Sequence, residues 1–514
     1  MSNDQDHDQN QDHGPDHGQN QDRTAESAGD PVVVVGAGPC GLVIACELLR
    51  LGVPTRLLEA DSEPHTGSRA VLLWPPTLDV LDGLGMLDDA QARGVRPAAL
   101  AYHMPDGKTL RVALGKANEP LVLPQQETTQ LLLGVLEKLG GRVEYGVRVT
   151  DVSTADDTVT LATEGPDGAT ETITAPWLIG ADGVGSTVRQ KLGIPFEGGS
   201  VPMTFVLAEG EVTGDFGRDA VQYFLGHKGA VLLSPLPGGL VRISGPVAPD
   251  MPMTREAVQQ MLDERAPAGL RYVSATSIDS FTSQERIART LRSGRAFLAG
   301  DAAHVHSVVG GQGLNLGIQD GRNLAWKLAG VIQGTLSPAV LDSYTIERRA
   351  VAEQVVQTTG RMIRQAAAGP FASRVRNGVW ALMQATGTLR RWYAPMLAGR
   401  LTRYPDVLFG APAPKPPRGL PAPGTRTPAW VPAAGPGQEG FRLLTLGPGD
   451  AAALRPAAER LAAAHPDVLT YGHVSHRRTG WLLLRPDGFV AASGKDAPQL
   501  AAIEGPLARI VAGR

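Results

Sequence analysis

The residues best suited to chemistry lie in one run, from Leu298 to Gly317. Apolar residues at its start predict a short buried strand over 296–299, which ends at Gly300-Asp301. An acid at the end of a strand is well placed to accept hydrogen bonds from a sugar-like polyol. The run therefore begins with a candidate polyol-binding carboxylate.

The second half of this run is a glycine loop followed by a helix, expected from about Leu314. Its glycines would let backbone N–H groups approach a ligand closely, and a helix N-terminus favours an anion. The candidate ligand contacts are Gly311, Gly313, Leu314 and Asn315, with Gly310 beside them. A polyol, a diphosphate and an anionic ring would all be bound by this bend, and that combination fits FAD better than a nucleotide alone.

A second candidate site follows the four valines at 32–35, which predict a buried parallel strand. Gly36, Gly38 and Gly41, with Pro39 among them, form G-x-G-x-x-G at the turn into a helix expected over 42–51. The next predicted strand, Thr55 to Glu59, ends in an acid. A glycine motif between a strand and a helix, with an acid about twenty residues further on, is typical of dinucleotide binding, with the acid on the adenosine ribose.

A third strand, turn and helix unit runs from Trp177 to Arg189, with Asp182 at the carboxyl end of the strand. Open α/β sheets bind ligands at that end. The alternative for Asp182 is a helix N-cap, and the presence of the other two units favours ligand binding.

Two further residues are candidate cofactor contacts because of their positions. Arg69 follows the first nucleotide-binding unit, where a diphosphate would be near, and Gln125 lies near the N-terminus of another predicted helix. A helix is also expected over 77–87, and strands near 143–149 and 158–162 are expected to form a hairpin.

From about 202 to 281 the residues alternate as in antiparallel strands. This pattern predicts a sheet inserted before the Leu298–Gly317 run, forming the far wall of a pocket. Its polar residues Tyr223, His227 and Arg242, together with Val308 of the glycine loop, are candidate pocket residues. No acid–base residue can be assigned from the sequence.

Composition sets the remaining limits. The chain has 514 residues, a net charge of -4 and 42% hydrophobic residues, which fits two or three globular domains and gives no basic field for nucleic acid. No apolar run reaches the 18 residues of a membrane span, and no basic-then-apolar leader begins the chain. Cys40 and Cys46 point to different faces of one helix and are not expected to bridge, which fits a reducing cytoplasm. No metal-ligand cluster is expected.

The ends of the chain differ from the rest. Residues 1–29 are polar and are expected to be disordered. A proline-rich linker, 406–424, precedes a segment with four predicted strands, the last two joined by the turn signal Arg485-Pro-Asp-Gly488.

Together the three motifs resemble the single-component FAD-dependent aromatic hydroxylases, in particular the branch of phenol hydroxylases and hydroxylases of aromatic polyketides. The motifs stand as Gly36-Ala-Gly-Pro-Cys-Gly41, Gly180-Ala-Asp-Gly-Val-Gly-Ser-Thr-Val-Arg189, and Gly300-Asp301 continuing to Gly310-Gly-Gln-Gly-Leu-Asn315. The resemblance implies an α/β fold: a Rossmann-like FAD-binding domain (30–200 and 286–405, the latter with helices), an inserted antiparallel β-sheet substrate domain (201–285), and a C-terminal thioredoxin-like domain (425–514). That last domain has no cysteines and could not perform dithiol chemistry.

The resemblance also implies roles. Gly36, Gly38 and Gly41 would admit the diphosphate of non-covalently bound FAD, and Glu59 its adenosine ribose. Arg69 and Gln125 would contact the diphosphate and ribityl region, and Asp301 the ribityl chain. The backbone from Gly311 to Asn315 would face the N1–C2=O edge of the flavin, and Asp182 and Arg189 are associated with FAD and NADPH.

The implied activity is a monooxygenase in which NADPH or NADH, as a transient co-substrate, reduces the flavin. O2 then gives a C4a-hydroperoxide that hydroxylates a bulky phenolic or polyketide-like ring. The expected partners are that aromatic substrate and O2, with no nucleic acid or membrane, in a cytoplasmic monomer or homodimer. Ser307 and Val308 replace two prolines usual in the family. That departure leaves Baeyer–Villiger or epoxidising oxygenation open, beside a non-oxygenating FAD-dependent reductase or cyclase.

Overall fold

The computed structural model describes residues 29–65, 70–226, 228–307, 310–366, 370–405, 415–433, 439–448 and 453–511. Its central layer is a six-stranded sheet in the order β17-β18-β11-β1-β2-β7. The members are β17 (Arg292–Ser293), β18 (Ala296–Leu298), β11 (Leu178–Gly180), β1 (Val32–Val35), β2 (Thr55–Glu59) and β7 (Val143–Tyr145). All neighbours are parallel except the β17–β18 hairpin. The predicted strands of all three motifs therefore share one Rossmann-like sheet.

Long helices cover this sheet. Helix α1 (Pro39–Arg50) packs between α7 (Gly313–Ile332) and α4 (Gln125–Lys138). The helix expected over 77–87 is instead two helices, α2 (Pro75–Gly83) and α3 (Leu87–Arg93), because Gly85 takes a φ of 69° between them. Apolar side chains of α1, α4, α7 and the sheet form one continuous core.

The prediction that 143–149 forms one strand paired with 158–162 is wrong for the first half of that strand. Strand β7 pairs with β2 in the central sheet, while β8 (Arg148–Thr154), β9 (Val159–Glu164) and β10 (Thr170–Ala175) form a separate three-stranded sheet. Gly146, with a φ of 72°, turns the chain between β7 and β8, so the two halves of the predicted strand belong to different sheets.

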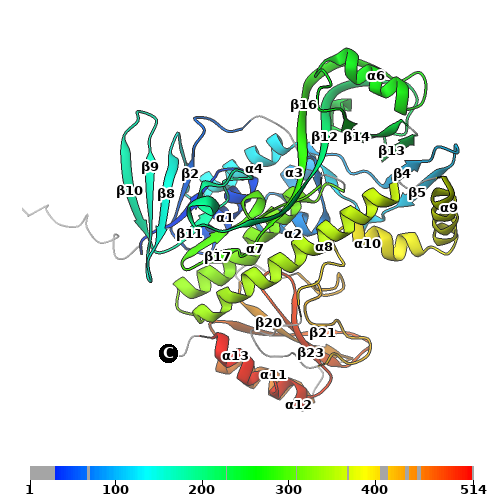
Figure 1. Ribbon diagram of the computed structural model, residues 1–514. Coiled ribbons are helices and arrows are strands. Elements are labelled where there is room, and N and C mark those ends of the chain that lie inside the picture. Colours follow the sequence, from blue (N-terminus) through cyan, green and yellow to red (C-terminus); the bar gives the residue numbers. More distant parts are fainter. Residues whose placement is uncertain are drawn as a thin grey trace, which may run out of the picture.

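An eight-stranded sheet, ordered β19-β16-β12-β15-β14-β13-β4-β5, rises from the central layer (Figure 1). Its longest strands, β12 (Phe196–Thr213) and β16 (Arg271–Ala288), have 18 residues each. The others are β13 (Ala220–Gly226), β14 (Gly229–Pro235), β15 (Val241–Val247), β4 (Ala99–His103), β5 (Thr109–Ala113) and β19 (His304–Val305). The sequence pattern at 202–281 did not include β4, which joins β13 in parallel from a distant part of the chain.

One face of this large sheet is covered by α6 (Arg255–Arg265), whose Val258, Met261 and Leu262 pack on it. The opposite face meets a helical segment made of α8 (Asp342–Ala366), α9 (Pro370–Ala385), a π-helix (Leu389–Tyr393) and α10 (Ala394–Leu397). The sheet is therefore packed on both faces, by α6 on one and by the helical segment on the other.

The C-terminal region forms a four-stranded sheet in the order β21-β20-β22-β23. Its elements are β20 (Phe441–Gly447), α11 (Arg455–Ala464), β21 (Leu469–Ser475), β22 (Gly480–Leu484), β23 (Val490–Gly494), α12 (Ala497–Ala501) and α13 (Glu504–Ile510). Parallel β20 and β21 flank α11, and an antiparallel hairpin and two helices follow. This is the thioredoxin-like arrangement that the resemblance implied.

A buried ionic cluster fastens the C-terminal domain to the rest of the chain. Arg485, in the predicted turn, donates to both carboxylate oxygens of Glu347 on α8, at 2.5 and 2.8 Å. Lys327 of α7 donates to the same carboxylate at 2.7 Å, and Asp487 accepts from Asn323 of α7 at 3.0 Å. All five side chains are buried. Burial by itself would raise the pKa of Glu347, but the charges of Arg485 and Lys327 hold it well below its usual range.

The described residues include no helix with the length and hydropathy needed to cross a membrane.

We expect Glu347→Gln to lower the free energy of unfolding by about 3–5 kcal/mol, because it leaves buried Lys327 without its ion-pair partner and leaves Arg485 with Asp487 alone. Urea unfolding followed by far-UV circular dichroism measures this loss. Glu353→Gln is the control on the same helix, since Glu353 pairs with Arg349 at the surface and should cost under about 1 kcal/mol. The sign with pH follows from the lowered pKa: stability is present above about pH 4.5 and is lost below it, less steeply in Glu347→Gln. Equal losses in the two variants would contradict the cluster's role.

Candidate functional site

The carboxyl edge of the central sheet brings the three motifs together. Val35 pairs with both Leu58 and Gly180, and Gly180 pairs with Leu298. The residues that follow these strands therefore lie in a row, and they include Gly36, Glu59, Asp182 and Asp301. This is the edge where open α/β sheets bind ligands.

The glycines of the first motif serve two different purposes. A Cβ on Gly36, whose φ is 100°, would lie 2.5 Å from Ala181 O, and one on Gly41 would lie 1.9 Å from Gly36 O. These two glycines therefore allow the backbone of the turn to pack tightly. Gly38 has no atom within 4 Å of its Cβ position and is the N-cap of α1, with Pro39 as the first helical residue. The open space at that helix N-terminus suits a phosphate group.

The carboxylate of Glu59 accepts hydrogen bonds from the backbone of this glycine turn and of the segment after β2. One carboxylate oxygen accepts from Ala37 N at 2.6 Å, and the other accepts from Asp61 N at 3.0 Å. The acid at the end of β2 is therefore held directly over the glycine turn.

Ser186 is the N-cap of the short helix α5 (Thr187–Lys191), and the side chain of Asp182 supports this capping turn. Its carboxylate accepts from Ser186 Oγ at 2.6 Å and from Val188 N at 3.1 Å. Arg189, also buried, donates to Ala302 O at 2.9 Å and lies over the ring of Phe196. The second motif thus supports the third, and Asp182 takes part in the first turn of α5 without being its N-cap, which is Ser186.

A buried acid, Asp320, holds the third motif in place. Asp320 of α7 accepts from Gly300 N at 2.9 Å, lies 2.8 Å from His304 Nε2 and pairs with Arg348 Nε at 2.5 Å. Burial by itself would raise its pKa, yet His304 and Arg348 hold the pKa of Asp320 below its usual range. Asp301, next to this anchor, keeps its side chain exposed at the carboxyl edge.

The glycine loop is held by Asn315, which is fully buried. Its Oδ1 accepts from Trp74 N and Thr77 Oγ1, both at 2.7 Å, and its Nδ2 donates to Leu72 O and Gly311 O. Gly310 and Gly311 have φ of 88° and 61°. Asn315 therefore positions the loop by its side chain, while Gly313 and Leu314 begin α7 with their N–H groups toward the loop.

Four more residues were predicted as cofactor or pocket contacts: Gln125, Arg69, His227 and Val308. Gln125 is the first residue of α4 and accepts from Ala70 N at 3.2 Å. Arg69, His227 and Val308 lie outside the described residues.

His306 is a site residue that was not selected from the sequence. Its Nδ1 lies 2.8 Å from Ser307 O, so Nδ1 must carry the proton and Nε2 is an acceptor. Nε2 is buried without a partner among the described residues, and it lies 3.8 Å from the Cβ position of Gly313. Burial lowers the pKa of His306 to about 4, so the ring is neutral. Only the nearby loop could have drawn attention to it in the sequence.

The face of the large sheet away from α6 carries an aromatic wall. Tyr223 stacks on Tyr102 of β4 with ring centroids 4.7 Å apart, and Trp380 of α9 meets Tyr102 edge-on at 5.6 Å. The hydroxyls of Tyr102 and Tyr393 lie 3.3 Å apart. Burial raises the pKa of Tyr102 and of Tyr223, so both stay protonated at neutral pH. The wall is continuous with Trp74, whose Nε1 donates to Gly310 O of the glycine loop at 2.9 Å.

Arg242 lies on the same face as Tyr223, because Tyr223 pairs with Leu232, and Leu232 with Ser244, two residues from Arg242. It is 2% exposed and forms an ion pair with Glu209 on β12. Tyr102, Trp380 and Tyr393 were missed because they come from segments that meet Tyr223 only in the folded chain.

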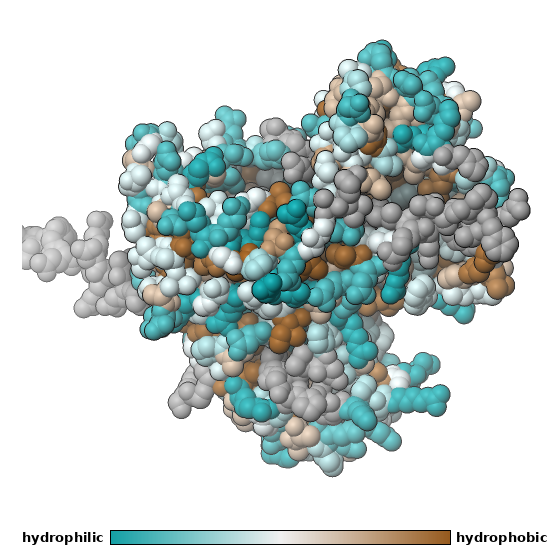
Figure 2. Space-filling model, in the orientation of Figure 1, coloured by the Kyte–Doolittle hydropathy of each residue, from teal (hydrophilic) through white to brown (hydrophobic). Residues whose placement is uncertain are grey.

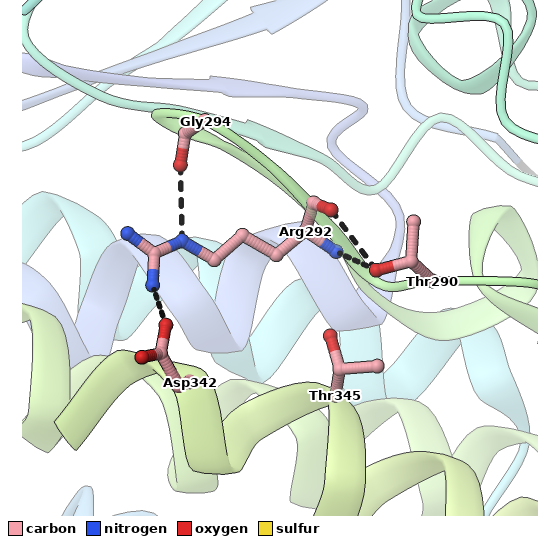
Figure 3. Close-up of a pocket in the computed structure, with 5 residues that line it drawn as sticks. All are labelled: Thr290, Arg292, Gly294, Asp342 and Thr345. Atoms are coloured by element: carbon pink, nitrogen blue, oxygen red, sulfur yellow. Dashed lines mark hydrogen bonds and ion pairs between the residues drawn. The ribbon is translucent and has the colours of Figure 1, made fainter. Parts of the chain in front are cut away.

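A shallow pocket near β17 is not this site (Figure 3). Arg292 donates to Gly294 O at 3.0 Å and to Asp342 at 2.6 Å, and Thr290 bonds the Arg292 backbone. Its polar groups are satisfied by one another and leave little to bind a ligand.

The residues at the carboxyl edge fit FAD. They offer an open helix N-terminus at Gly38, an exposed carboxylate at Asp301, and a second helix N-terminus after a glycine loop beside an unpartnered His306 Nε2. A diphosphate, a polyol and an electron-rich ring need these groups.

The comparisons with known proteins give the class. A family described as "FAD binding domain" matches residues 30–359. The chain belongs to this FAD-binding family, within the FAD-dependent aromatic hydroxylases, and is an FAD-dependent monooxygenase that uses NADPH or NADH.

Particular relatives agree with this class. The chain is 32% identical to 6-methylpretetramide 4-monooxygenase of Streptomyces rimosus over 91% of this chain and 92% of that protein. The structure of OxyS anhydrotetracycline hydroxylase from Streptomyces rimosus superposes with a TM-score of 0.76, at 29% identity over 94% and 99% of the two chains. The Diels-Alderase PyrE3 of the pyrroindomycin pathway also matches, with a TM-score of 0.72 at 25% identity over 95% and 100%.

We expect Asn315→Ala to weaken FAD binding at least tenfold, because four buried groups lose their partner and the loop loosens; each unsatisfied group costs about 1–3 kcal/mol. Release of flavin fluorescence on dilution measures the dissociation constant. Gln333→Ala, at the other end of α7, is the control and should leave FAD affinity unchanged. Unchanged affinity in Asn315→Ala would contradict the loop's role.

Proposed function

We propose that this monooxygenase adds one oxygen atom of O2 to a bulky, electron-rich aromatic substrate of the phenolic or polyketide type. The observation that carries this proposal is the aromatic wall of Tyr102, Tyr223, Trp380 and Tyr393, which is continuous with Trp74 at the glycine loop. Aromatic rings stack favourably on other aromatic rings. The two relatives from Streptomyces rimosus are named for 6-methylpretetramide and anhydrotetracycline, which supports a substrate of the polyketide type.

The cofactor contacts follow from the carboxyl edge. We assign the FAD diphosphate to Gly36, Gly38, Pro39 and Gly41 at the N-terminus of α1, and the adenosine ribose to Glu59. Gln125, Asp182 and Arg69 would support the diphosphate and ribityl region from neighbouring elements. Once reduced by NAD(P)H, the bound FAD supplies the activated oxygen.

Asp301 and the glycine loop would hold the other half of the cofactor. The exposed carboxylate of Asp301 would accept from ribityl hydroxyls, and the N–H groups from Gly311 to Asn315 would face the N1–C2=O edge. The side chain of Asn315 itself is occupied by Trp74, Thr77 and Leu72.

The protein's own groups shape the reaction in two ways. The apolar wall excludes water, which protects a reactive oxygen species from side reactions. His306 Nε2, a buried acceptor beside Gly313, would accept a hydrogen bond from an N–H or O–H group of the flavin or the substrate. The low pKa of His306 keeps its ring neutral across the physiological range. Protonated Tyr223 and Tyr102 could donate but not accept a proton.

A second candidate function is a cyclisation without oxygen transfer, favoured by one observation. The PyrE3 structure shows that a similar fold belongs to a Diels-Alderase. Baeyer–Villiger or epoxidising oxygenation would use the same fold. Only the structure of the product distinguishes these two reactions from hydroxylation.

Turnover with NADPH, candidate polycyclic phenols and ¹⁸O₂, followed by mass analysis, tests the proposal. One labelled oxygen on an intact ring system is the expected result. Insertion beside a carbonyl would instead indicate Baeyer–Villiger chemistry, and an unlabelled product formed without O2 would indicate cyclisation.

We expect Asp301→Ala to weaken FAD binding about 10- to 100-fold, because a hydrogen bond to a charged group contributes about 1.5–3 kcal/mol. Equilibrium dialysis of the purified protein measures the change. Asp157→Ala, in a surface pair with Arg295, is the control and should retain FAD fully. Full FAD occupancy in Asp301→Ala would remove Asp301 from the ribityl contact.

A further inference from the structure

A basic groove of about 730 Å³ lies between the segment after α10 and the loops of the C-terminal domain. It is lined by residues from the stretches 400–403, 419–430 and 476–478. Five arginines and one histidine contribute to it, and none of its described lining residues is acidic: Arg400, Arg403, Arg426, Arg477, Arg478 and His476. A groove with this lining is strongly positive.

In the described part of the chain these arginines are at most partly balanced, since the carboxylate of Asp79 acts at longer range on Arg400 and Arg426 alone. Within the described ranges no carboxylate lies at ion-pair distance from any of the five. The partners that they do have are neutral: Arg400 Nε donates to Ala117 O at 2.7 Å, Arg426 Nε to Gly399 O at 3.1 Å, and Arg478 to Gly419 O. Burial lowers the pKa of Arg426 to about 10, which still leaves it charged at neutral pH. By contrast, Arg348 and Arg485 each have a buried carboxylate.

An aromatic surface lies among these charges. Trp430 is 41% exposed, and its ring stacks on His476 with centroids 4.3 Å apart and planes 16° from parallel. The imidazole covers one side of the indole, and the exposed remainder offers a flat apolar surface. A planar heterocyclic base stacks well on such a ring.

Size and shape select the kind of ligand. The groove is concave and falls in the range of about 300–1,000 Å³ typical of small-molecule sites. Guanidinium groups bind phosphate oxygens in pairs, and the indole suits a base. Because the surface is concave and small, a nucleotide fits it better than a membrane or a nucleic-acid strand.

We propose that this groove binds a nucleoside phosphate, with its phosphates on Arg403, Arg477 and Arg478 and its base on Trp430. Two sources share this chemistry: the phosphorylated adenosine end of NAD(P)H, and a separate adenine nucleotide. The first source rests on the proposed NAD(P)H-dependent activity. It is also connected to the site, because Gln312 of the glycine loop donates to Leu397 O at 2.9 Å, three residues before Arg400.

Titration calorimetry on the FAD-loaded enzyme tests the groove itself, with adenosine 2′,5′-bisphosphate, ADP and tripolyphosphate as probes. We expect at least one nucleotide to bind at least tenfold more tightly than tripolyphosphate. The double variant Arg477→Ala/Arg478→Ala should weaken it at least tenfold, and Trp430→Ala at least threefold. Arg460→Ala, an exposed arginine on α11, is the matched control and should bind as the parent does.

Nucleotide binding that is absent, unaffected by both variants, or no tighter than tripolyphosphate would overturn the proposal. Thermal unfolding of each variant shows that it is folded, and Trp430→Ala keeps the test decisive if the double variant is unstable.

Anaerobic reduction of the flavin distinguishes the two sources. A KM for NADPH that rises at least tenfold in the double variant, with an unchanged limiting rate, identifies the co-substrate. Tight ADP binding with an unchanged KM identifies a separate nucleotide. Neither measurement needs an aromatic substrate or O2, so a failure of the proposed hydroxylation leaves this result intact.

Discussion

The buried carboxylate of Asp320 is the interaction on which the site depends. It accepts from Gly300 N at the end of β18, lies against His304 and pairs with Arg348 of α8. A buried charge is costly unless it is paired and hydrogen-bonded, and here one carboxylate has all its partners on different elements. One of these partners is Gly300 N, which directly precedes Asp301. The hydrogen bond from Gly300 N to Asp320 therefore helps to hold the exposed Asp301 at the carboxyl edge of the sheet.

Helix α7 extends this constraint through the molecule. Its N-terminus begins in the glycine loop, its middle holds Asp320, and Asn323 and Lys327 join the buried cluster with Glu347 and Arg485. The thioredoxin-like domain, which lacks cysteine, is thereby attached to the same helix that begins at the glycine loop. Through these contacts the domain supports α7 from outside the site. Its loops also form one side of the basic groove.

The large sheet carries the aromatic wall that we propose for the substrate. Its face toward α6 is an apolar core, whereas the other face combines tyrosines, Trp380 and the Arg242–Glu209 pair. The helical segment packs on this face, and it also exposes apolar residues to solvent: Val375, Val379, Leu382 and Trp392. Figure 2 shows hydrophobic atoms, in brown, at the surface on the side of the molecule where α9 and α10 lie in Figure 1. The aromatic wall is thus built from three segments far apart in sequence.

The sequence by itself determined the elements whose signals are local. Four valines followed by spaced glycines predict β1 and its turn, and β2 ends at Glu59 as expected, because strand and turn preferences act over a few residues. The three motifs also determined the family, and with it the two-part FAD domain. The tertiary structure alone decided what depends on distant pairing: β7 joins β2, β4 joins β13, and Tyr102 meets Tyr223. The strand and ring pairings leave no periodic mark in the chain, since each partner is specified by packing against residues far away in the sequence.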